Sequence, residues 1–312
     1  MLFYAVREAP VPVKILTKMN SLRYNRMMTH QDINSDTALY CIFGKPVRQS
    51  LSPVMHNRAF RETGINAVYL AFEPASAGAA LQAMRSLGIR GASVTIPFKV
   101  DIMNGIDAID PLAENIGSVN TLINDRGMIT GYNTDGYGAL RALGERDIPI
   151  RNAVALVLGN GGSARAIAFT LLANGARVIL AGRNPEKVAG LARDLSRNHD
   201  PVESVLIRDL DRAIMDAVDI IINTTPAGMA PDTDSSIIGD ELILPRHAVF
   251  DIVYSPHLTR LLAGAEKKGC TIVHGIDMLI YQGVRQFELW TGTEAPAAAM
   301  AAAVYEHRNK RA

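Results

Sequence analysis

The stretch AVALVLGNGGSARAIAFTLLANG, residues 153–175, joins an apolar strand-like run to a helix-like run through a loop rich in glycine. The loop satisfies the pattern GxGxxA between a strand and a helix, the context in which this pattern is informative. Its glycines let the backbone approach a pyrophosphate, which then lies on the free N–H groups at the positive end of the helix. A tight turn without a ligand is the alternative. The stretch therefore predicts an α/β domain that binds a dinucleotide.

Unbroken apolar runs continue after this loop. They are ARVILAG, VESVLI, DIIINTT, AVFDIVY and CTIVHG, with helices expected between them. Strands that are covered on both faces have this pattern, so their sheet is predicted to be parallel and doubly wound. The first of these runs ends just before Arg183, where an enzyme that prefers NAD usually places a carboxylate. Because a guanidinium matches a phosphate, Arg183 and Lys187 suit the 2′-phosphate of NADP, and two solvated cations at a helix start are the alternative.

An earlier α/β series precedes the glycine loop. From Leu39 onward, strand-like YCIFG, AVYLAF, GASVTIP, SVNTLIN and MITGYN alternate with helices expected near residues 53–63, 76–87 and 136–145. The turn-like RDIPIRN follows, so we expect a domain boundary near residues 145–150. Residues 1–36 are poorly patterned and are expected to form a dispensable N-terminal extension, with Met27 or Met28 as alternative starts.

The composition bounds the class of protein. A chain of 312 residues with 48% hydrophobic residues can fill two hydrophobic cores. Its 32 basic and 31 acidic residues nearly cancel, so we expect no positive electrostatic field strong enough to bind nucleic acid or an acidic membrane surface. A small-molecule partner fits better. Cys41 and Cys270 stand in apolar strand-like contexts, which favours buried thiols of a reducing compartment over a disulfide or a metal site. Charged Arg7, Glu8 and Lys14 interrupt any signal peptide, and no apolar run approaches the roughly 18 residues of a membrane span, so we expect a cytoplasmic protein.

Polar side chains follow the strands of the earlier series. In GASVTIPFK, Pro97 ends the strand, so Thr95 and Lys99 are expected near the C-terminal edge of the sheet, where open α/β sheets bind ligands. SVNTL and GYNTDG also end strands, and they bring Asn120 and Asp135 beside Lys99 as a neutral donor and a carboxylate. Each of these residues alone is more simply a turn, helix-cap or solvated residue. Their common edge favours a binding site.

The loop GKPVRQSLSPVMHN, residues 44–57, lies between a strand and a helix but has the period of neither. It carries two hydroxyls two residues apart, on Ser50 and Ser52, followed directly by Pro53. The absence of a packing period indicates that a requirement other than packing selects these residues.

Together these segments resemble the shikimate/quinate dehydrogenase family, and most of all its shikimate dehydrogenases. The resemblance covers roughly residues 38–308 and is carried, in order, by GKPVRQSLSPVMHN, GASVTIPFK, GSVNTL, GYNTDG, LGNGGSAR, AGRNPEKV, INTTPAGM, DIVYSP and GIDMLIYQG. It implies an N-terminal α/β substrate domain at residues 37–147, a Rossmann-like NADP domain at 148–275, and a C-terminal helix within 276–312 that packs back on the first domain. It also implies a monomer or homodimer that reduces 3-dehydroshikimate to shikimate reversibly with NADPH, in the pathway to chorismate and aromatic amino acids.

The resemblance implies roles for single residues. Ser50 and Ser52 would bind the carboxylate of shikimate. Lys99 and Asp135 would be the catalytic pair, with Lys99 as proton donor, because a lysine beside a carboxylate is protonated near neutrality. Other substrate contacts are expected from Thr95, Asn120, Tyr254 and Gln282. Cofactor contacts are expected from Gly159, Asn160, Gly161, Gly162, Ser163, Ala164, Arg183, Lys187, Thr225, Ile252 and Gly275.

Some positions depart from the family pattern. Ser93 stands where the family usually has Asn, Asn160 replaces Ala in the glycine loop, and Gly182-Arg183-Asn184 replaces Asn-Arg-Thr, which weakens the case for strict NADP preference. His56 is expected to be structural, His257 has no assigned role, and no spacing of His or Cys indicates a metal. Two alternatives remain open: a quinate/shikimate dehydrogenase that uses NAD, and a catalytically silent sensor of metabolites. The intact catalytic pair argues against the sensor.

Overall fold

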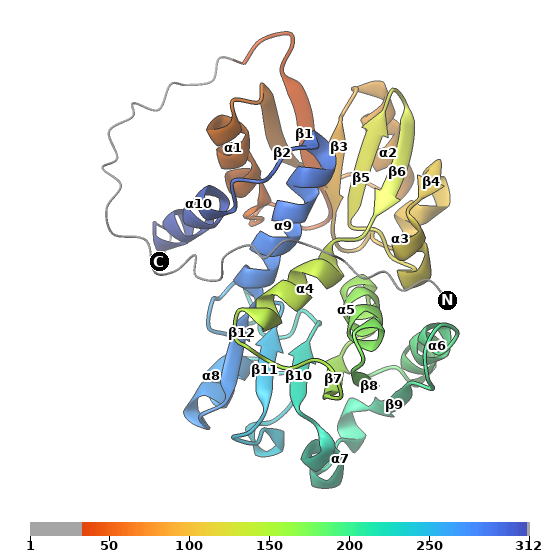
Figure 1. The fold of residues 1–312 in the computed structure, drawn as a ribbon, viewed down its shortest axis with the longest axis vertical. Coiled ribbons are helices and arrows are strands. Elements are labelled where there is room, and N and C mark those ends of the chain that lie inside the picture. The colour runs from red at the N-terminus through yellow and green to blue at the C-terminus, as the bar shows by residue number, and fades with distance from the viewer. Residues whose placement is uncertain (1–32, 311–312) are drawn as a thin grey trace. The chain divides into compact units, whose positions relative to one another are not determined.

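The computed structural model describes residues 33–310, which contain two six-stranded sheets with helices packed on them (Figure 1). The expected N-terminal extension, residues 1–36, lies outside the described residues apart from 33–36. No helix in the described part of the chain is long and apolar enough to cross a membrane. The predicted α/β class, with a substrate-domain sheet followed by a doubly wound sheet, is confirmed.

The first sheet mixes parallel and antiparallel strands. Its strands are β1 (Ala38–Phe43), β2 (Ala67–Phe72), β3 (Gly91–Val94), β4 (Ala108–Ile109), β5 (Thr121–Asp125) and β6 (Met128–Tyr132), in the order β2-β1-β3-β5-β6-β4. β1 pairs parallel with β2 and β3, whereas β5 pairs antiparallel with β3 and β6. The β5–β6 hairpin turns through Arg126 and Gly127, whose φ angles are both positive, 53° and 97°, as a tight two-residue hairpin loop requires.

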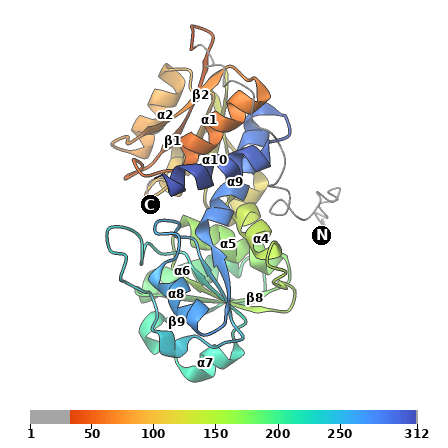
Figure 2. The same ribbon diagram turned by 90° about the vertical axis from the view of Figure 1, so that its left-hand side faces the viewer.

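Helices cover both faces of the first sheet. They are α1 (Ser52–Thr63), α2 (Ala77–Ser86), α3 (Pro111–Ile116), α9 (Gly275–Thr291) and α10 (Ala297–Asn309). One core joins α2 to the sheet through residues such as Phe43 and Met84. The other core joins α1, α9 and α10 to the sheet and includes Phe60, Tyr69 and Phe287. Figure 2 shows α9 and α10 beside α1, so the chain returns to its first sheet at the C-terminus, as the resemblance implied.

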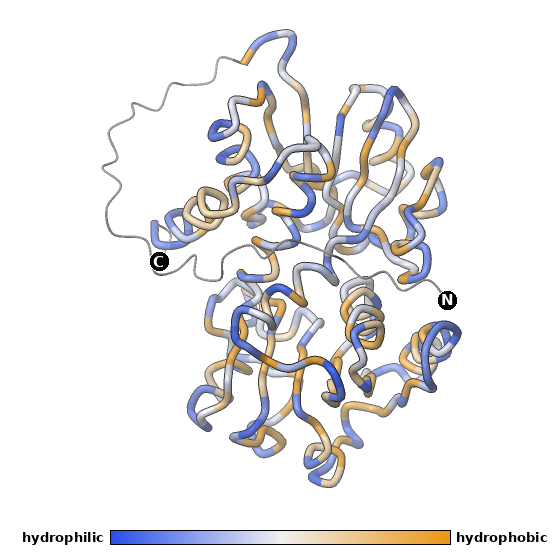
Figure 3. The backbone as a smooth tube through the Cα atoms, viewed as in Figure 1, coloured by the Kyte–Doolittle hydropathy of each residue, from blue (hydrophilic) through white to orange (hydrophobic). Residues whose placement is uncertain are grey.

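The second sheet is parallel throughout. Its strands are β7 (Val154–Leu158), β8 (Arg177–Gly182), β9 (Glu203–Leu206), β10 (Ile220–Asn223), β11 (Ala248–Asp251) and β12 (Thr271–His274). The order β12-β11-β10-β7-β8-β9 reverses direction between β7 and β10, and such a switch point is where doubly wound sheets bind ligands. The central strands are buried and largely hydrophobic (Figure 3), which confirms the parallel, doubly wound sheet predicted from the unbroken apolar runs.

Alternate side chains of the second sheet serve two cores. Its helices are α5 (Gly162–Ala173), α6 (Pro185–Leu195), α7 (Arg212–Ala217) and α8 (Arg260–Lys267). Ala155 and Val157 of β7 pack with α5 and α6, whereas Leu156 and its alternate neighbours pack with α7 and α8. α5 begins at Gly162, so the last residues of the glycine loop already form the first helical turn.

The chain passes between the two halves at two helices, α4 (Asp135–Gly144) and α9, and α4 lies at the first crossing. α4 packs against α5 and α9. The crossing with α9 is close at Gly138, where an added Cβ would lie 2.8 Å from Met278 O and 2.9 Å from Gln282 Cβ. α4 therefore brings residues of both halves to its N-terminal end.

The two cysteines differ in burial. Cys41 is buried within β1, as expected, but Cys270 is only partly buried, and its Sγ donates to Leu244 O (3.1 Å). The expectation of two buried thiols is therefore wrong for Cys270, because it lies just before β12, a strand at the edge of its sheet.

Candidate active site

A buried ion pair stands where the two halves meet. Lys99 Nζ donates to Asp135 Oδ2, and the side chains of the pair are only 12% and 5% exposed. Lys99 lies beyond β3, and Asp135 is the first residue of α4. Lys99 Nζ also donates to Ser163 Oγ (3.1 Å), at the start of α5. The expected catalytic pair is therefore in contact, and it touches the glycine loop.

Asn120 orients the Asp135 carboxylate. Its Nδ2 donates to Asp135 Oδ1 (2.8 Å), so the two carboxylate oxygens have different partners. The amide of Asn120 is itself oriented, because its Oδ1 accepts from Thr134 N (2.8 Å) and Thr121 Oγ1 (2.7 Å). Asp135 Oδ2 remains for Lys99.

A second layer of polar side chains, not expected from the sequence, lies behind Asn120. Gln286 Nε2 donates to Asn120 O (3.1 Å) and Thr121 Oγ1 (2.9 Å). Ser93 Oγ donates to Gln286 Oε1 (2.8 Å) and accepts from the Tyr69 hydroxyl (2.6 Å). The sequence carried two signs of this polar layer: the departure from the family pattern at Ser93, and a second glutamine, Gln286, one helical turn after Gln282. Neither sign indicated that these two side chains contact each other.

Gln282 joins the same network. Asn120 Nδ2 lies 3.4 Å from Gln282 Oε1, and Gln282 Nε2 donates to Leu279 O (2.9 Å). Thr95 lies just beyond β3, where its backbone N–H donates to Phe43 O (2.9 Å). Among the described residues, the Thr95 side chain makes no hydrogen bond to the other expected substrate residues. The structure therefore brings together Lys99, Asn120, Asp135 and Gln282, with Thr95 at the adjoining strand end.

The two loop serines lie near Tyr254. Ser50 Oγ accepts from the backbone N–H of Ser52 (3.2 Å), and Ser52 is buried at the start of α1. Burial raises the pKa of Tyr254, and its hydrogen bond with Ser50 partly opposes that rise. The three residues expected around the substrate carboxylate and ring are thus neighbours of one another.

The expected cofactor residues lie at the C-terminal ends of the strands of the second sheet. Gly159 has a φ of 122°, and a Cβ there would collide with the Thr224 side chain. Thr225 donates through its N–H and hydroxyl to Asn223 Oδ1 at the end of β10. A Cβ on Gly275 would collide with Ile252 O, so these two positions are also adjacent. Glycine is required at 159 and 275 for these close approaches.

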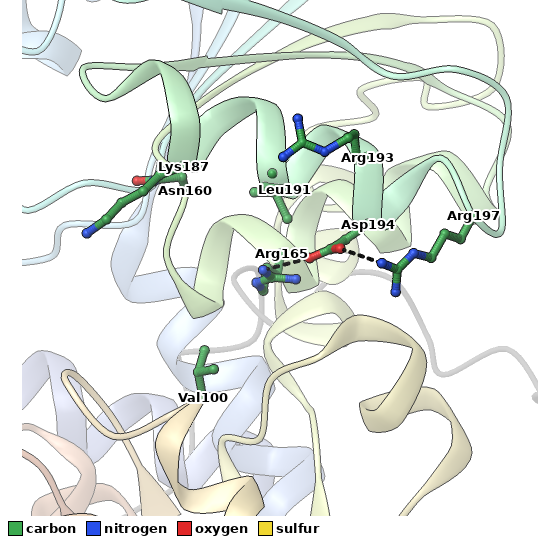
Figure 4. Close-up of a pocket in the computed structure, with 9 residues that line it drawn as sticks. Val100, Asn160, Arg165, Lys187, Leu191, Arg193, Asp194 and Arg197 are labelled. Atoms are coloured by element: carbon green, nitrogen blue, oxygen red, sulfur yellow. Dashed lines mark hydrogen bonds and ion pairs between the residues drawn. The ribbon is translucent and has the colours of Figure 1, made fainter.

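A cavity of about 750 Å³ lies beside the glycine loop (Figure 4). Its polar lining comes from Asn160, Arg165, Lys187, Arg193, Asp194 and Arg197. Asp194 holds Arg165 (3.0 Å) and Arg197 (3.4 Å), so cations outnumber the carboxylate and the cavity suits a phosphate group. Lys187 lines this cavity, whereas Arg183 is exposed outside its lining.

The two histidines singled out in the sequence make no hydrogen bond to the ion pair within residues 33–310; His56 is buried and His257 is partly buried. His56 stacks on Tyr69, with ring centres 4.6 Å apart, and burial lowers its pKa to about 3. His257 stacks on His274 at 4.0 Å, and burial, with the electrostatic effect of His274 next, lowers the pKa of His257 to about 4. Both are therefore neutral at neutral pH. Within residues 33–310, no group of three or more His, Cys, Asp or Glu side chains could hold a metal ion.

Three family models match successive parts of the chain. Residues 42–122 match the substrate binding domain of shikimate dehydrogenase, residues 142–237 match shikimate/quinate 5-dehydrogenase, and residues 275–305 match the C-terminal domain of shikimate 5′-dehydrogenase. The matches span both halves of the fold and the returning helices.

Similar whole proteins bear related names. The chain is 44% identical over 273 residues to a shikimate dehydrogenase (NADP(+)) of Moorella thermoacetica, covering 86% of this chain and 92% of that protein. It is 42% identical to the enzyme of the same name from Methanopyrus kandleri, covering 90% and 99%.

Solved structures agree in fold. One is a shikimate dehydrogenase in complex with NADP+, at 39% identity and a TM-score of 0.83, covering 88% of this chain and 97% of that chain. Another is a quinate dehydrogenase from Corynebacterium glutamicum in complex with NAD, at 28% identity and a TM-score of 0.79, covering 86% and 99%.

Proposed function

The chain belongs to the shikimate dehydrogenase family, and we propose that Lys99 and Asp135 carry out its reversible, NADP-dependent oxidation of shikimate to 3-dehydroshikimate. It is an oxidoreductase that acts on a CH–OH group in the pathway to aromatic amino acids. The catalytic roles of Lys99 and Asp135 are proposed from one observation: the two side chains form an ion pair that contacts both Asn120 and the glycine loop.

The residues present fit the cofactor. The glycine loop precedes α5, whose free N–H groups suit a pyrophosphate, and the cationic cavity beside Asn160 suits a further phosphate. When bound there, the nicotinamide cofactor would supply the hydride-transfer chemistry of both directions, and the protein would supply binding, orientation and the proton. We assign cofactor contacts to the glycine loop, to Lys187 and Arg183, and to the strand ends at Thr225, Ile252 and Gly275.

Lys99 handles the proton in this proposal. In the reductive direction its ammonium group donates a proton to the oxygen that becomes the hydroxyl. Asp135 holds Lys99 through Oδ2 and, with Asn120 and Gln282, supports ring hydroxyls of the substrate. In the oxidative direction the pair accepts the proton, so the two directions should prefer different pH values.

The neutral serine loop binds the substrate carboxylate in this proposal. The hydroxyls of Ser50 and Ser52, with nearby backbone N–H groups, replace an arginine clamp, while Tyr254 and Thr95 border the ring. We assign residues 37–147 with 276–312 to the substrate domain and residues 148–275 to the NADP domain. We also infer a cytoplasmic protein, from the free cysteines, and a monomer or homodimer, from the family resemblance.

A quinate/shikimate dehydrogenase that uses NAD is the second candidate. It is favoured by the similarity to a quinate dehydrogenase in complex with NAD and by the position of Arg183 outside the cationic cavity. Initial rates with shikimate and quinate, each with NADP and NAD, discriminate the two candidates. Highest kcat/KM for shikimate with NADP supports the proposal, and highest kcat/KM for quinate with NAD favours the second candidate.

The role of Lys99 has a separate test. If Lys99 transfers the proton, Lys99→Ala lowers kcat by roughly 10² to 10⁴, since general acid–base catalysis contributes that much. Calorimetric titration of shikimate should show a much smaller change in affinity. A kcat within a few fold of wild type would contradict the assignment. Binding of shikimate by wild type without turnover with either cofactor would favour the sensor.

A further inference from the structure

The Ser163 hydroxyl links the cofactor loop to the proton-transfer pair. Ser163 Oγ lies 3.1 Å from Lys99 Nζ and 3.4 Å from Asp135 Oδ2. Ser163 is in the first turn of α5 in the second half of the fold, whereas Lys99 and Asp135 belong to the first half and the connecting helix. The resemblance assigned Ser163 only to the cofactor, so this contact requires a separate explanation.

The approach of the loop to Lys99 depends on the glycine before Ser163. A Cβ on Gly162 would lie 2.9 Å from Lys99 Cβ and 2.7 Å from the buried Ser118 Oγ, which are distances that real Cβ atoms do not tolerate. Any larger side chain at 162 would hold the loop away from Lys99. The glycine therefore allows the contact between Ser163 and Lys99, in addition to any close approach of a pyrophosphate.

Packing of two helices sets the position of Ser163 relative to Asp135. Each residue lies in the first turn of its helix, Asp135 on α4 and Ser163 on α5. The helices pack closely at Gly136, where a Cβ would collide with Thr170 Oγ1 and lie 3.2 Å from Ala166 O. Because close-packed helices move little relative to each other, the hydroxyl and the carboxylate form a rigid pair of acceptors for Lys99.

Two acceptors restrict the ammonium group of Lys99. A lysine has three N–H donors on a flexible four-carbon stem, so one ion pair does not determine where the other donors point. Asp135 and Ser163 accept two of them, and the third N–H is left for a substrate oxygen. We propose that Ser163 is a positioning residue for proton transfer, which orients Lys99 from the cofactor loop. The inference rests on the proposed function, since it takes Lys99 as the proton donor.

The test compares Ser163→Ala with wild type under saturating shikimate and NADP. We expect kcat to fall roughly tenfold, the effect of losing one hydrogen bond to a charged group. KM for shikimate and the Kd for NADP, the latter measured by calorimetry, should each change less than about threefold, since alanine keeps the backbone N–H that the glycine loop offers the cofactor and the lost side-chain contact is with the proton donor. Ser163→Thr keeps the hydroxyl and should recover most of the rate. Ser86→Ala, which removes an exposed hydroxyl bonded to Gln82 O of its own helix, is the matched control.

A double-mutant cycle separates action through Lys99 from a general effect. In the Lys99→Ala background, Ser163→Ala should lower kcat no further, because the group that it positions is gone. The inference is overturned if Ser163→Ala keeps kcat within twofold, if it weakens NADP binding with kcat unchanged, or if its effect persists in full without Lys99. If instead wild type turns over shikimate and Lys99→Ala does not lower kcat, the proposed function of Lys99 fails and this inference with it.

Discussion

Replacing Gln286 with leucine should destabilise the first half of the fold and slow turnover. The Gln286 side chain is 1% exposed and makes three hydrogen bonds, to Ser93, Asn120 and Thr121. Leucine has a similar size but leaves the buried Ser93 O–H without its acceptor, which costs about 1–3 kcal/mol. Asn120 O and Thr121 Oγ1 keep other partners, and each lost bond there contributes about 1 kcal/mol or less. After a partial offset from the added apolar surface, we expect a loss of about 2–4 kcal/mol in the free energy of unfolding.

Fluorescence of the single tryptophan provides the assay. Trp290 lies one helical turn after Gln286, donates to Leu122 O (3.0 Å) and packs on His56, so its emission during urea unfolding reports on this region. Gln82→Leu on the exposed side of α2 is the matched control and should change stability by less than about 0.5 kcal/mol. A lower kcat for shikimate should accompany the loss, because Asn120 orients Asp135. If Gln286→Leu leaves the free energy of unfolding unchanged, the stabilisation assigned to its three hydrogen bonds is wrong.

Three further outcomes are expected. Burial lowers the pKa of His56 to about 3, so the folded protein keeps this side chain neutral while the unfolded chain protonates it below about pH 6.5; its contribution to stability is complete above pH 6.5 and is lost as pH falls toward 3. Urea unfolding at pH 4.5 should therefore show a free energy of unfolding about 3 kcal/mol lower than at pH 7. The His56→Gln variant should lack this loss, and equal losses in the two proteins would contradict the prediction. Gly138→Ala places a Cβ against Met278 O and Gln282 Cβ, so it should lower the stability measured by thermal unfolding by about 1–3 kcal/mol. An unchanged Tm would mean that α4 and α9 can move apart without cost and that their close packing does not stabilise the fold. Arg183→Ala should weaken NADP binding roughly tenfold to a hundredfold and NAD binding little, as measured by calorimetry, and an equal loss for both would argue against contact with the 2′-phosphate.

Local pattern was sufficient for most of the second half of the fold. The unbroken apolar runs predicted a parallel sheet covered on both faces, and the glycine loop predicted the strand-to-helix turn after β7. The first sheet was harder, because its order depends on antiparallel pairing of β5 with β3 and β6, which the segments do not specify one by one. Its hairpin turn at Arg126 and Gly127 is a local signal that could have indicated part of this pairing.

The sequence by itself determined the identities of the reactive groups and the edges where they lie. Lys99, Asn120 and Asp135 each follow or precede a strand or helix end, and ends of neighbouring strands meet at one edge whatever the details of packing. Only the tertiary structure decided which partners complete the site. Gln286 reaches Asn120 from 166 residues away in the chain, and Ser163 reaches Lys99 from 64 residues away. Such contacts depend on how α9 and α5 pack against the rest of the fold. That packing is set jointly by many side chains and by glycines that allow close approach, so no local sequence pattern predicts it.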